Sequence, residues 1–239
     1  MSEPQRVVGI IGGMGPLATA DLIEKITKLT PVAREQDHLR LLVDSHPQIP
    51  DRNDAVWGSG PSPAPAMAES ARLLERSGAE LIVIACNTAH HWVDEVAASV
   101  SVPVISMVDV TVQAAVARRP ARVGVMAITA CLATSMYQDR LAASGIQSLT
   151  LDDAEQAAFT RTIAGIKASG RTDALRASML HHADALIDGG AELLIAGCTE
   201  IPIVIGEADV RVPVISSTDE LARATVAAAR RAPVSTLQP

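Results

Sequence analysis

Two cysteines follow apolar segments that match each other in the two halves of the chain. Cys86 ends the segment 79–86 and Cys198 ends the segment 191–198, and both segments begin Ala-Glu-Leu and run through aliphatic residues up to the thiol. A thiol can act as a general acid and its thiolate as a general base when a cation, a helix N-terminus or a hydrogen-bond donor supports the ionised form. Two thiols that face one cleft would therefore suit two-base chemistry, with proton removal on one face of a carbon and proton delivery on the other.

The match between the halves extends well beyond the cysteines. Residues 7–11 recur at 122–126, and residues 102–106 recur at 212–216, in each case about 110–115 residues later. Self-similarity over most of a chain predicts two copies of one structural unit. We therefore expect each copy to place one thiol just past the carboxyl end of a strand, where open α/β sheets bind their ligands.

Short β-branched segments alternate with helical stretches, which is typical of parallel sheets covered by helices. Strands are predicted at residues 7–11, 39–44, 81–85, 104–107, 122–127, 148–151, 193–196 and 214–216. The pattern predicts an α/β fold of two pseudosymmetric parallel-sheet domains, produced by internal duplication, with the active site in the cleft between them. The first domain is expected to span residues 1–111 together with a C-terminal helix within 216–239, and the second to span 112–215.

Composition argues against several kinds of partner and setting. The net charge is −7 and aromatic residues make up only 2% of the chain, so we expect no nucleic-acid partner. No apolar run approaches the ~20 residues of a membrane helix, so we expect no membrane association. Three cysteines are an odd number and do not make a disulfide framework, which favours a reduced, cytoplasmic setting.

Polar residues directly follow both matched thiols. Asn87 and Thr88 follow the first, and Thr199 and Glu200 follow the second. Their side chains, with the backbone N–H groups of a helix N-terminus, could bind an α-carboxylate. The same residue types also cap helices, and the two roles are compatible. Cys131 has no counterpart in the other half, so we predict that it packs in the core.

No metal or cofactor is expected from the sequence. His181 and His182 read as solvent-exposed helix positions, with no cysteine or carboxylate at ligand spacing. No lysine lies in a recognisable Schiff-base motif, so we expect no pyridoxal phosphate.

Four motifs, taken in order, resemble the aspartate/glutamate racemase family. They are Gly-Ile-Ile-Gly-Gly-Met-Gly-Pro-Leu-Ala-Thr at 9–19, His-Pro-Gln-Ile-Pro-Asp-Arg at 46–52, Cys-Asn-Thr-Ala-His at 86–90 and Gly-Cys-Thr-Glu-Ile-Pro at 197–202. The resemblance implies two pseudosymmetric α/β domains and racemisation without pyridoxal phosphate or metal. It also implies that Cys86 and Cys198 are the two acid–base groups.

The resemblance favours the aspartate racemase branch of that family. Gly12 and Gly13 stand where cell-wall glutamate racemases carry Asp-Ser, and Glu200 stands where they carry His. In the aspartate branch an Arg and a Lys hold the side-chain carboxylate of the substrate, and these positions match Arg52 and Lys167. The planar guanidinium suits a carboxylate, and the ammonium adds a compact charge.

The resemblance also implies roles for the other site residues. Asp51 and Glu200 would orient or protonate the two thiols. The substrate-binding set would be Met14, Arg52, Asn87, Thr88, Thr129, Lys167 and Thr199. The chain departs from the family pattern where Cys131 and Leu132 replace Gly-Thr and where Ser216 replaces Asp. Loss of a hydroxyl donor at Leu132 leaves the substrate's identity open.

These observations predict a homodimeric, cofactor-independent racemase for aspartate, with glutamate as the second substrate. Other isomerisations by related two-cysteine proteins remain open, namely maleate cis-trans isomerisation and hydantoin racemisation. Addition of one thiol to the maleate double bond would not need two acid–base partners. A third alternative is a non-catalytic protein that binds dicarboxylates and whose thiols are incidental.

Overall fold

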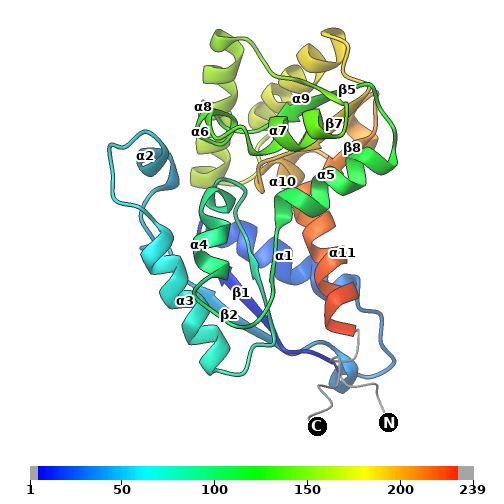
Figure 1. Cartoon of the computed structure of the whole chain (residues 1–239). Coiled ribbons are helices and arrows are strands. Elements are labelled where there is room, and N and C mark those ends of the chain that lie inside the picture. Colours follow the sequence, from blue (N-terminus) through cyan, green and yellow to red (C-terminus); the bar gives the residue numbers. More distant parts are fainter. Residues whose placement is uncertain (1–4, 231–239) are drawn as a thin grey trace.

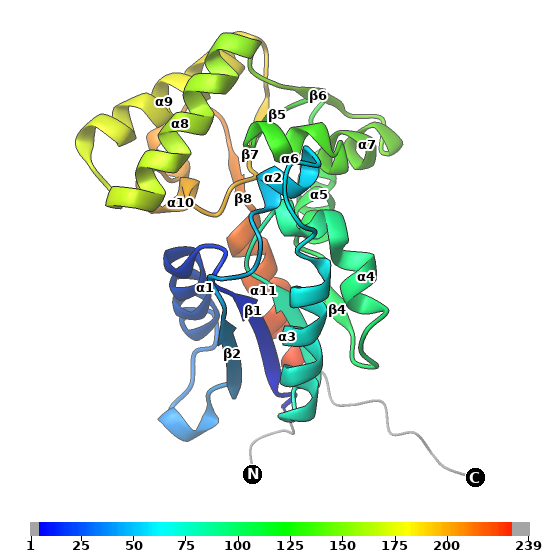
Figure 2. The same ribbon diagram turned by 90° about the vertical axis from the view of Figure 1, so that its left-hand side faces the viewer.

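The computed structural model describes residues 5–230, which contain two four-stranded parallel sheets. The first sheet has the order β2-β1-β3-β4, with β1 at Val8–Gly12, β2 at Leu41–Ser45, β3 at Leu81–Ile84 and β4 at Val104–Ile105. The second has the order β6-β5-β7-β8, with β5 at Arg122–Met126, β6 at Gln147–Leu149, β7 at Leu193–Ala196 and β8 at Val214–Ser216. The two orders are equivalent, which confirms the α/β fold of two parallel sheets. Figures 1 and 2 show the first sheet below the second.

Helices cover both sheets. Those of the first half are α1 (Pro16–Lys28), α2 (Arg52–Val56), α3 (Ala64–Arg76), α4 (Val93–Ala97) and α5 (Met107–Ala117). Those of the second half are α6 (Thr129–Ala133), α7 (Met136–Ala143), α8 (Asp153–Ser169), α9 (Asp173–Asp188), α10 (Ile201–Val204) and α11 (Ser217–Arg230). Short 3₁₀ turns lie at Glu35–Asp37, Thr88–Trp92 and Glu207–Asp209.

All eight predicted strands are present, with small differences at their ends. The strand predicted at 104–107 is shorter in the structure, because β4 stops at Ile105. The reason is a cap: the Ser106 side chain accepts a hydrogen bond from the backbone N–H of Asp109 and starts α5. An N-cap of this kind satisfies one of the backbone donors that the first turn of a helix leaves without a partner.

Two helices cross between the halves. Helix α5 follows β4 of the first sheet, yet its Val108 and Val112 lie in the hydrophobic core around the second sheet. Helix α11 follows β8 of the second sheet, and its Leu221 and Val226 lie in a core beneath the first. The two helices contact each other, and Figure 1 shows α11 running from the upper sheet down past α1. The domain boundary predicted at 111/112 therefore falls inside α5, and residues 231–239 of the predicted C-terminal segment lie outside the described residues.

The glycine-rich loop after β1 brings two motifs of the sequence together. Gly13 has a φ of +87°, and a Cβ there would lie 2.5 Å from the backbone of His46. Only glycine allows this approach at a positive φ. The loop is tied to the first turn of α1, because the backbone N–H of Gly13 donates to Thr19 Oγ1 over 2.9 Å. The loop that ends in Arg52 is thereby held beside Met14.

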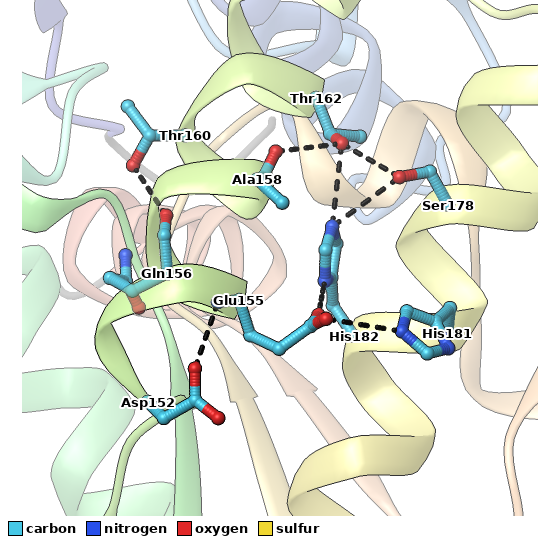
Figure 3. A network of polar contacts seen from close by, with 9 residues as sticks. All are labelled: Asp152, Glu155, Gln156, Ala158, Thr160, Thr162, Ser178, His181 and His182. Atoms are coloured by element: carbon cyan, nitrogen blue, oxygen red, sulfur yellow. Dashed lines mark hydrogen bonds and ion pairs between the residues drawn. The ribbon is translucent and has the colours of Figure 1, made fainter.

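Helices α8 and α9 are joined by a polar network around His182 (Figure 3). The prediction that His182 is solvent-exposed is wrong: it is 1% exposed, and its Nδ1 lies 2.9 Å from Glu155 Oε2 while its Nε2 faces Thr162 and Ser178. Nothing in the sequence pairs His182 with Glu155, because this carboxylate is close to it in space and distant in sequence. Among residues 5–230, no three His, Cys, Asp or Glu side chains are arranged to hold a metal.

No helix within the described part of the chain is long and apolar enough to cross a bilayer.

Candidate active site

A cavity of about 210 Å³ lies where loops of the first half meet helices of the second. The first half contributes the start of α1 and the start of α2, and the second half contributes the end of α8 and the segment 200–203. The lining residues are Met14, Gly15, Pro16, Leu17, Asp51, Arg52, Ile166, Lys167, Glu200 and Ile203. The structure thus brings five predicted site residues to one cavity: Met14, Asp51, Arg52, Lys167 and Glu200.

The Cys198 thiol and the Glu200 carboxylate form a buried pair, of which Glu200 lines this cavity. Cys198 lies two residues beyond β7 and its Sγ donates to Glu200 Oε2 over 2.9 Å. The Thr199 hydroxyl donates to the same oxygen over 3.3 Å. Burial, followed by the Glu200 carboxylate, raises the pKa of Cys198 well above its ordinary value. In this arrangement Cys198 is held as a thiol, which is the acid form that can deliver a proton.

Lys167 supplies a positive charge between the carboxylate and the cavity. Its Nζ lies 3.9 Å from Glu200 Oε1. Burial works against the ammonium, but the surrounding negative charge, that of Glu200 first, outweighs it and raises the pKa of Lys167. Lys167 therefore stays protonated and is placed to attract an anionic group that enters the cavity.

Arg52 is held at the cavity by the backbone around it. Its Nη1 donates to the carbonyls of Ile49 and Pro50 over 3.2 and 3.0 Å, and its Nη2 donates to the carbonyl of Met14 over 3.4 Å. A guanidinium has five N–H groups, so donors remain for a ligand after these contacts. Fixing the side chain in advance lowers the entropy lost when it binds a carboxylate.

Cys86 lies two residues beyond β3 and is 7% exposed. His90 fixes this strand end: its Nδ1 donates to the Cys86 carbonyl over 2.7 Å, and its Nε2 accepts from the backbone N–H of Met107 over 2.9 Å. This tautomer is required because a carbonyl can only accept and a backbone N–H can only donate. Burial lowers the pKa of His90 to about 4, so the ring is neutral.

Asp51 lies on the rim of the cavity and caps α2. Its Oδ1 accepts from the backbone N–H groups of Asn53 and Asp54 over 2.7 and 3.1 Å. Among the hydrogen bonds of the described residues, none joins Asp51 to Cys86. The capping contact explains its position beside Arg52; a role toward a thiol stays a prediction.

The remaining predicted site residues do not line the cavity; they are Cys86, Asn87, Thr88, Thr129, Cys198 and Thr199. Thr88 is buried near the Cys131 thiol, whose pKa is raised to about 12 by burial and next by Cys86. Thr129 is exposed at the start of α6, and its Oγ1 lies 3.1 Å from Thr160 Oγ1. Asn87 does not use its side chain to cap a helix but bonds two buried hydroxyls, considered below.

Sequence reasoning missed the apolar wall of the cavity. Pro16, Leu17, Ile166 and Ile203 line it from both halves. Nothing in the sequence marks these aliphatic residues as different from core positions, but the 54% exposure of Leu17 does so in the structure. The cavity therefore combines two cations and two carboxylates with an apolar side.

The fold and the site define a two-sheet α/β protein with a matched thiol just beyond the carboxyl end of one strand in each sheet, β3 and β7, and with a charged cavity between its halves. Residues 11–225 match the family described as Asp/Glu/hydantoin racemase. The chain belongs to this racemase family, and so to the isomerases.

Several relatives resemble the chain over nearly its whole length. An aspartate racemase of Picrophilus torridus is 31% identical and superposes with a TM-score of 0.86, with 94% of each chain covered. An aspartate racemase homologue from Pyrococcus horikoshii is 26% identical with a TM-score of 0.78, covering 95% of this chain and all of that one. The broad specificity amino-acid racemase RacX of Bacillus subtilis is 27% identical, with 92% of this chain and 96% of the relative covered.

Proposed function

We propose that this protein racemises aspartate, with glutamate as a second substrate, by proton transfer between two thiols without pyridoxal phosphate or metal. The observation that carries the proposal is the cavity in which Arg52 and Lys167 lie beside Glu200, the partner of the Cys198 thiol. Two cations fit a ligand with a carboxylate on its side chain. The similarity to the aspartate racemase of Picrophilus torridus supports the same substrate.

The proposed reaction moves one proton on each face of the α-carbon. The thiolate of one cysteine takes the α-hydrogen, the electron pair stays on carbon, and the thiol of the other cysteine donates its proton to the opposite face. The product is the mirror image of the substrate, and the two cysteines have exchanged protonation states. Because Glu200 holds Cys198 as a thiol in the described structure, we assign Cys198 as the acid and Cys86 as the base of that state.

The experiment that tests this function is deuterium incorporation at the α-carbon in D2O, screened across L- and D-amino acids. Aspartate should gain deuterium and invert, with glutamate next. The protein should need neither added pyridoxal phosphate nor metal, and dialysis against a chelator should leave the rate unchanged. Absence of α-deuterium in every amino acid, or a rate that metal restores after chelation, would contradict the proposal.

One observation favours a second candidate, a racemase of wider substrate range. The apolar wall made by Leu17, Ile166 and Ile203 could accept side chains without a carboxylate, and RacX of Bacillus subtilis is named for broad specificity. The same D2O screen separates the candidates, because a broad enzyme would exchange the α-hydrogen of neutral amino acids as fast as that of aspartate.

The alternatives in the racemase and isomerase class are tested with their own substrates. A hydantoin racemase would exchange a hydrogen of hydantoins and not of amino acids. A maleate isomerase would convert maleate to fumarate without any α-hydrogen exchange. A dicarboxylate-binding protein would bind aspartate without exchange. The proposed assembly is a homodimer, which light scattering at several concentrations would test.

A further inference from the structure

A chain of buried hydrogen bonds joins the two strand ends that carry the thiols. Tyr137 Oη and Asn87 Oδ1 are 2.5 Å apart, and Asn87 Nδ2 and Ser217 Oγ are 3.0 Å apart. Ser217 Oγ in turn donates to the carbonyl of Ala196 over 2.9 Å. Tyr137, Asn87 and Ser217 are each at most 3% exposed, so water does not compete for these contacts.

The direction of every bond in this chain is fixed. The Ala196 carbonyl can only accept, so Ser217 must donate to it and accept from Asn87. The Asn87 amide therefore turns its nitrogen toward Ser217 and its oxygen toward Tyr137, which must donate. Burial raises the pKa of Tyr137, which keeps the phenol protonated for this role. A buried network of satisfied hydrogen bonds rigidifies the elements that it joins.

This chain of hydrogen bonds joins the segments next to the two matched thiols. Asn87 immediately follows Cys86, and Ala196 lies two residues before Cys198. The Tyr137 ring also touches the second strand end directly: a Cβ on Gly197 would lie 3.3 Å from Tyr137 Cε2. The rigid ring thus reaches from the residue before one thiol to the residue after the other.

These contacts occupy the side chain of Asn87, which the sequence predicts to bind the substrate. The Asn87 amide uses its oxygen and one N–H inside the protein, although both could have faced the cavity. Asn87 is also absent from the cavity lining. Asn87 follows β3 of the first half, whereas Tyr137 lies on α7 and Ser217 starts α11, both in the second half. Its contacts therefore join the two halves.

We propose that Tyr137 is a positioning residue which, through Asn87 and Ser217, sets the separation and orientation of the Cys86 and Cys198 thiols. This inference rests on the proposed two-thiol racemisation. Two-base transfer needs both sulfur atoms in line with one carbon, and small displacements of reacting groups lower rates steeply. Tyr137 contacts neither thiol in this role; it acts through the backbone that carries them.

The kinetic test is Tyr137→Phe, which keeps the ring and removes the hydroxyl donor. We expect kcat for aspartate to fall on the order of tenfold or more, with KM changed by less than about twofold, because the loss is in alignment of the reacting groups. Ser217→Ala should likewise lower kcat and leave KM nearly unchanged. The matched control is Thr225→Val, which removes another fully buried hydroxyl on α11, one that donates to the Leu221 carbonyl.

A second measurement does not depend on activity. In the Cys131→Ser background, a short bifunctional thiol reagent is added and intact-protein mass spectrometry gives the share of protein bridged between Cys86 and Cys198. Tyr137→Phe should lower the bridged share relative to the doubly modified, unbridged share. Thr225→Val should leave it unchanged.

The outcomes separate this inference from the proposed function. A Tyr137→Phe protein with unchanged kcat and unchanged bridging overturns the positioning role. So does an equal loss of kcat in Thr225→Val, which would mean that any buried hydroxyl has this effect. If the wild type exchanges no α-hydrogen in D2O, the racemase proposal fails, and the bridging experiment still decides whether Tyr137 sets the thiol separation.

Discussion

Cys198 and Glu200, two residues apart, share one proton in a buried site: Cys198 Sγ and Glu200 Oε2 are 2.9 Å apart, and both residues are at most 6% exposed. Thiolate and carboxylate at this distance would repel each other where little water screens them. Burial, and then the Glu200 carboxylate, therefore raise the pKa of Cys198, and the proton stays on sulfur. Lys167 offsets part of the remaining negative charge.

Replacing Glu200 by Gln should change the pH dependence of racemisation. The carboxylate raises the pKa of Cys198 after burial, so its removal should lower that pKa and move the corresponding limb of the kcat/KM profile to lower pH. We also expect kcat to fall about 10²-fold, the usual loss for a missing acid–base partner. The measurement is a pH–rate profile on aspartate. Glu207→Gln, which changes an exposed carboxylate, is the control, and an unmoved profile for Glu200→Gln would remove Glu200 from proton transfer.

Replacing either matched thiol should abolish racemisation while leaving the fold intact. A serine hydroxyl is nearly isosteric with a thiol but is a far weaker acid, so Cys86→Ser and Cys198→Ser should each lose about 10²–10⁴-fold or more in kcat. Cys131→Ser is the matched control, because Cys131 is 1% exposed and burial keeps it protonated. Circular dichroism checks the fold. Near wild-type racemisation by either single variant would end the two-thiol mechanism.

The fold was predictable because its signals are local and repeated. Seven of the eight strands contain Val or Ile, and the repeat shows which strands correspond, so the eight strands and the parallel sheets follow from sequence. The exchange of α5 and α11 between the halves was not predictable in full. Nothing in the α5 sequence shows that Val108 and Val112 pack beside the second sheet.

The candidate site was predictable where a motif fixed the backbone. The glycine loop and the segment ending in Arg52 meet because Gly13 permits close approach, and both carry recognisable residues. Partners that depend on three-dimensional contact were not found. The burial of His182 against Glu155 is not predictable because the two are distant in sequence, and the same holds for the hydrogen bonds of Asn87 to Tyr137 and Ser217.

The buried His90 should make the protein less stable in mild acid. Its pKa is about 4 in the folded protein and 6.5 in a free side chain, so the folded state prefers the neutral ring. Above pH 6.5 His90 makes its full contribution to the free energy of unfolding. As the pH falls, the unfolded chain takes up a proton before the folded protein does, so this contribution decreases. The decrease ends below about pH 4, where both states are protonated. The difference corresponds to about 3 kcal/mol of unfolding free energy.

Urea unfolding of the wild type and of His90→Asn at pH 7.5 and pH 4.5 measures this contribution. The variant should be less stable at both pH values, because it loses the bonds to Cys86 and Met107, but its stability should change less with pH. His181→Asn, a substitution at an exposed ring, should keep the wild-type pH dependence. Equal pH dependence in the wild type and His90→Asn would show that His90 titrates normally.

The last prediction concerns the side-chain carboxylate of the substrate. If Arg52 pairs with that group, Arg52→Ala leaves an anion in the cavity without its main partner, at a cost of about 2–5 kcal/mol in transition-state binding to aspartate. Lys167→Ala should act in the same direction but more mildly, since a point charge has less geometric demand. Arg52→Lys should recover only part of the loss, because it restores the charge without the planar fork of donors.

Comparison of substrates decides what Arg52 does. Alanine has no second carboxylate, so the wild type should racemise it poorly and Arg52→Ala should change that rate little. Arg76→Ala, at an exposed position of α3, is the control for loss of a positive charge. Because Arg52 also donates to three backbone carbonyls, its loss could loosen the cavity as a whole. Equal losses of kcat/KM on aspartate, glutamate and alanine would therefore assign Arg52 to the fold or to the α-carboxylate, and the preference for acidic amino acids would lose its main support.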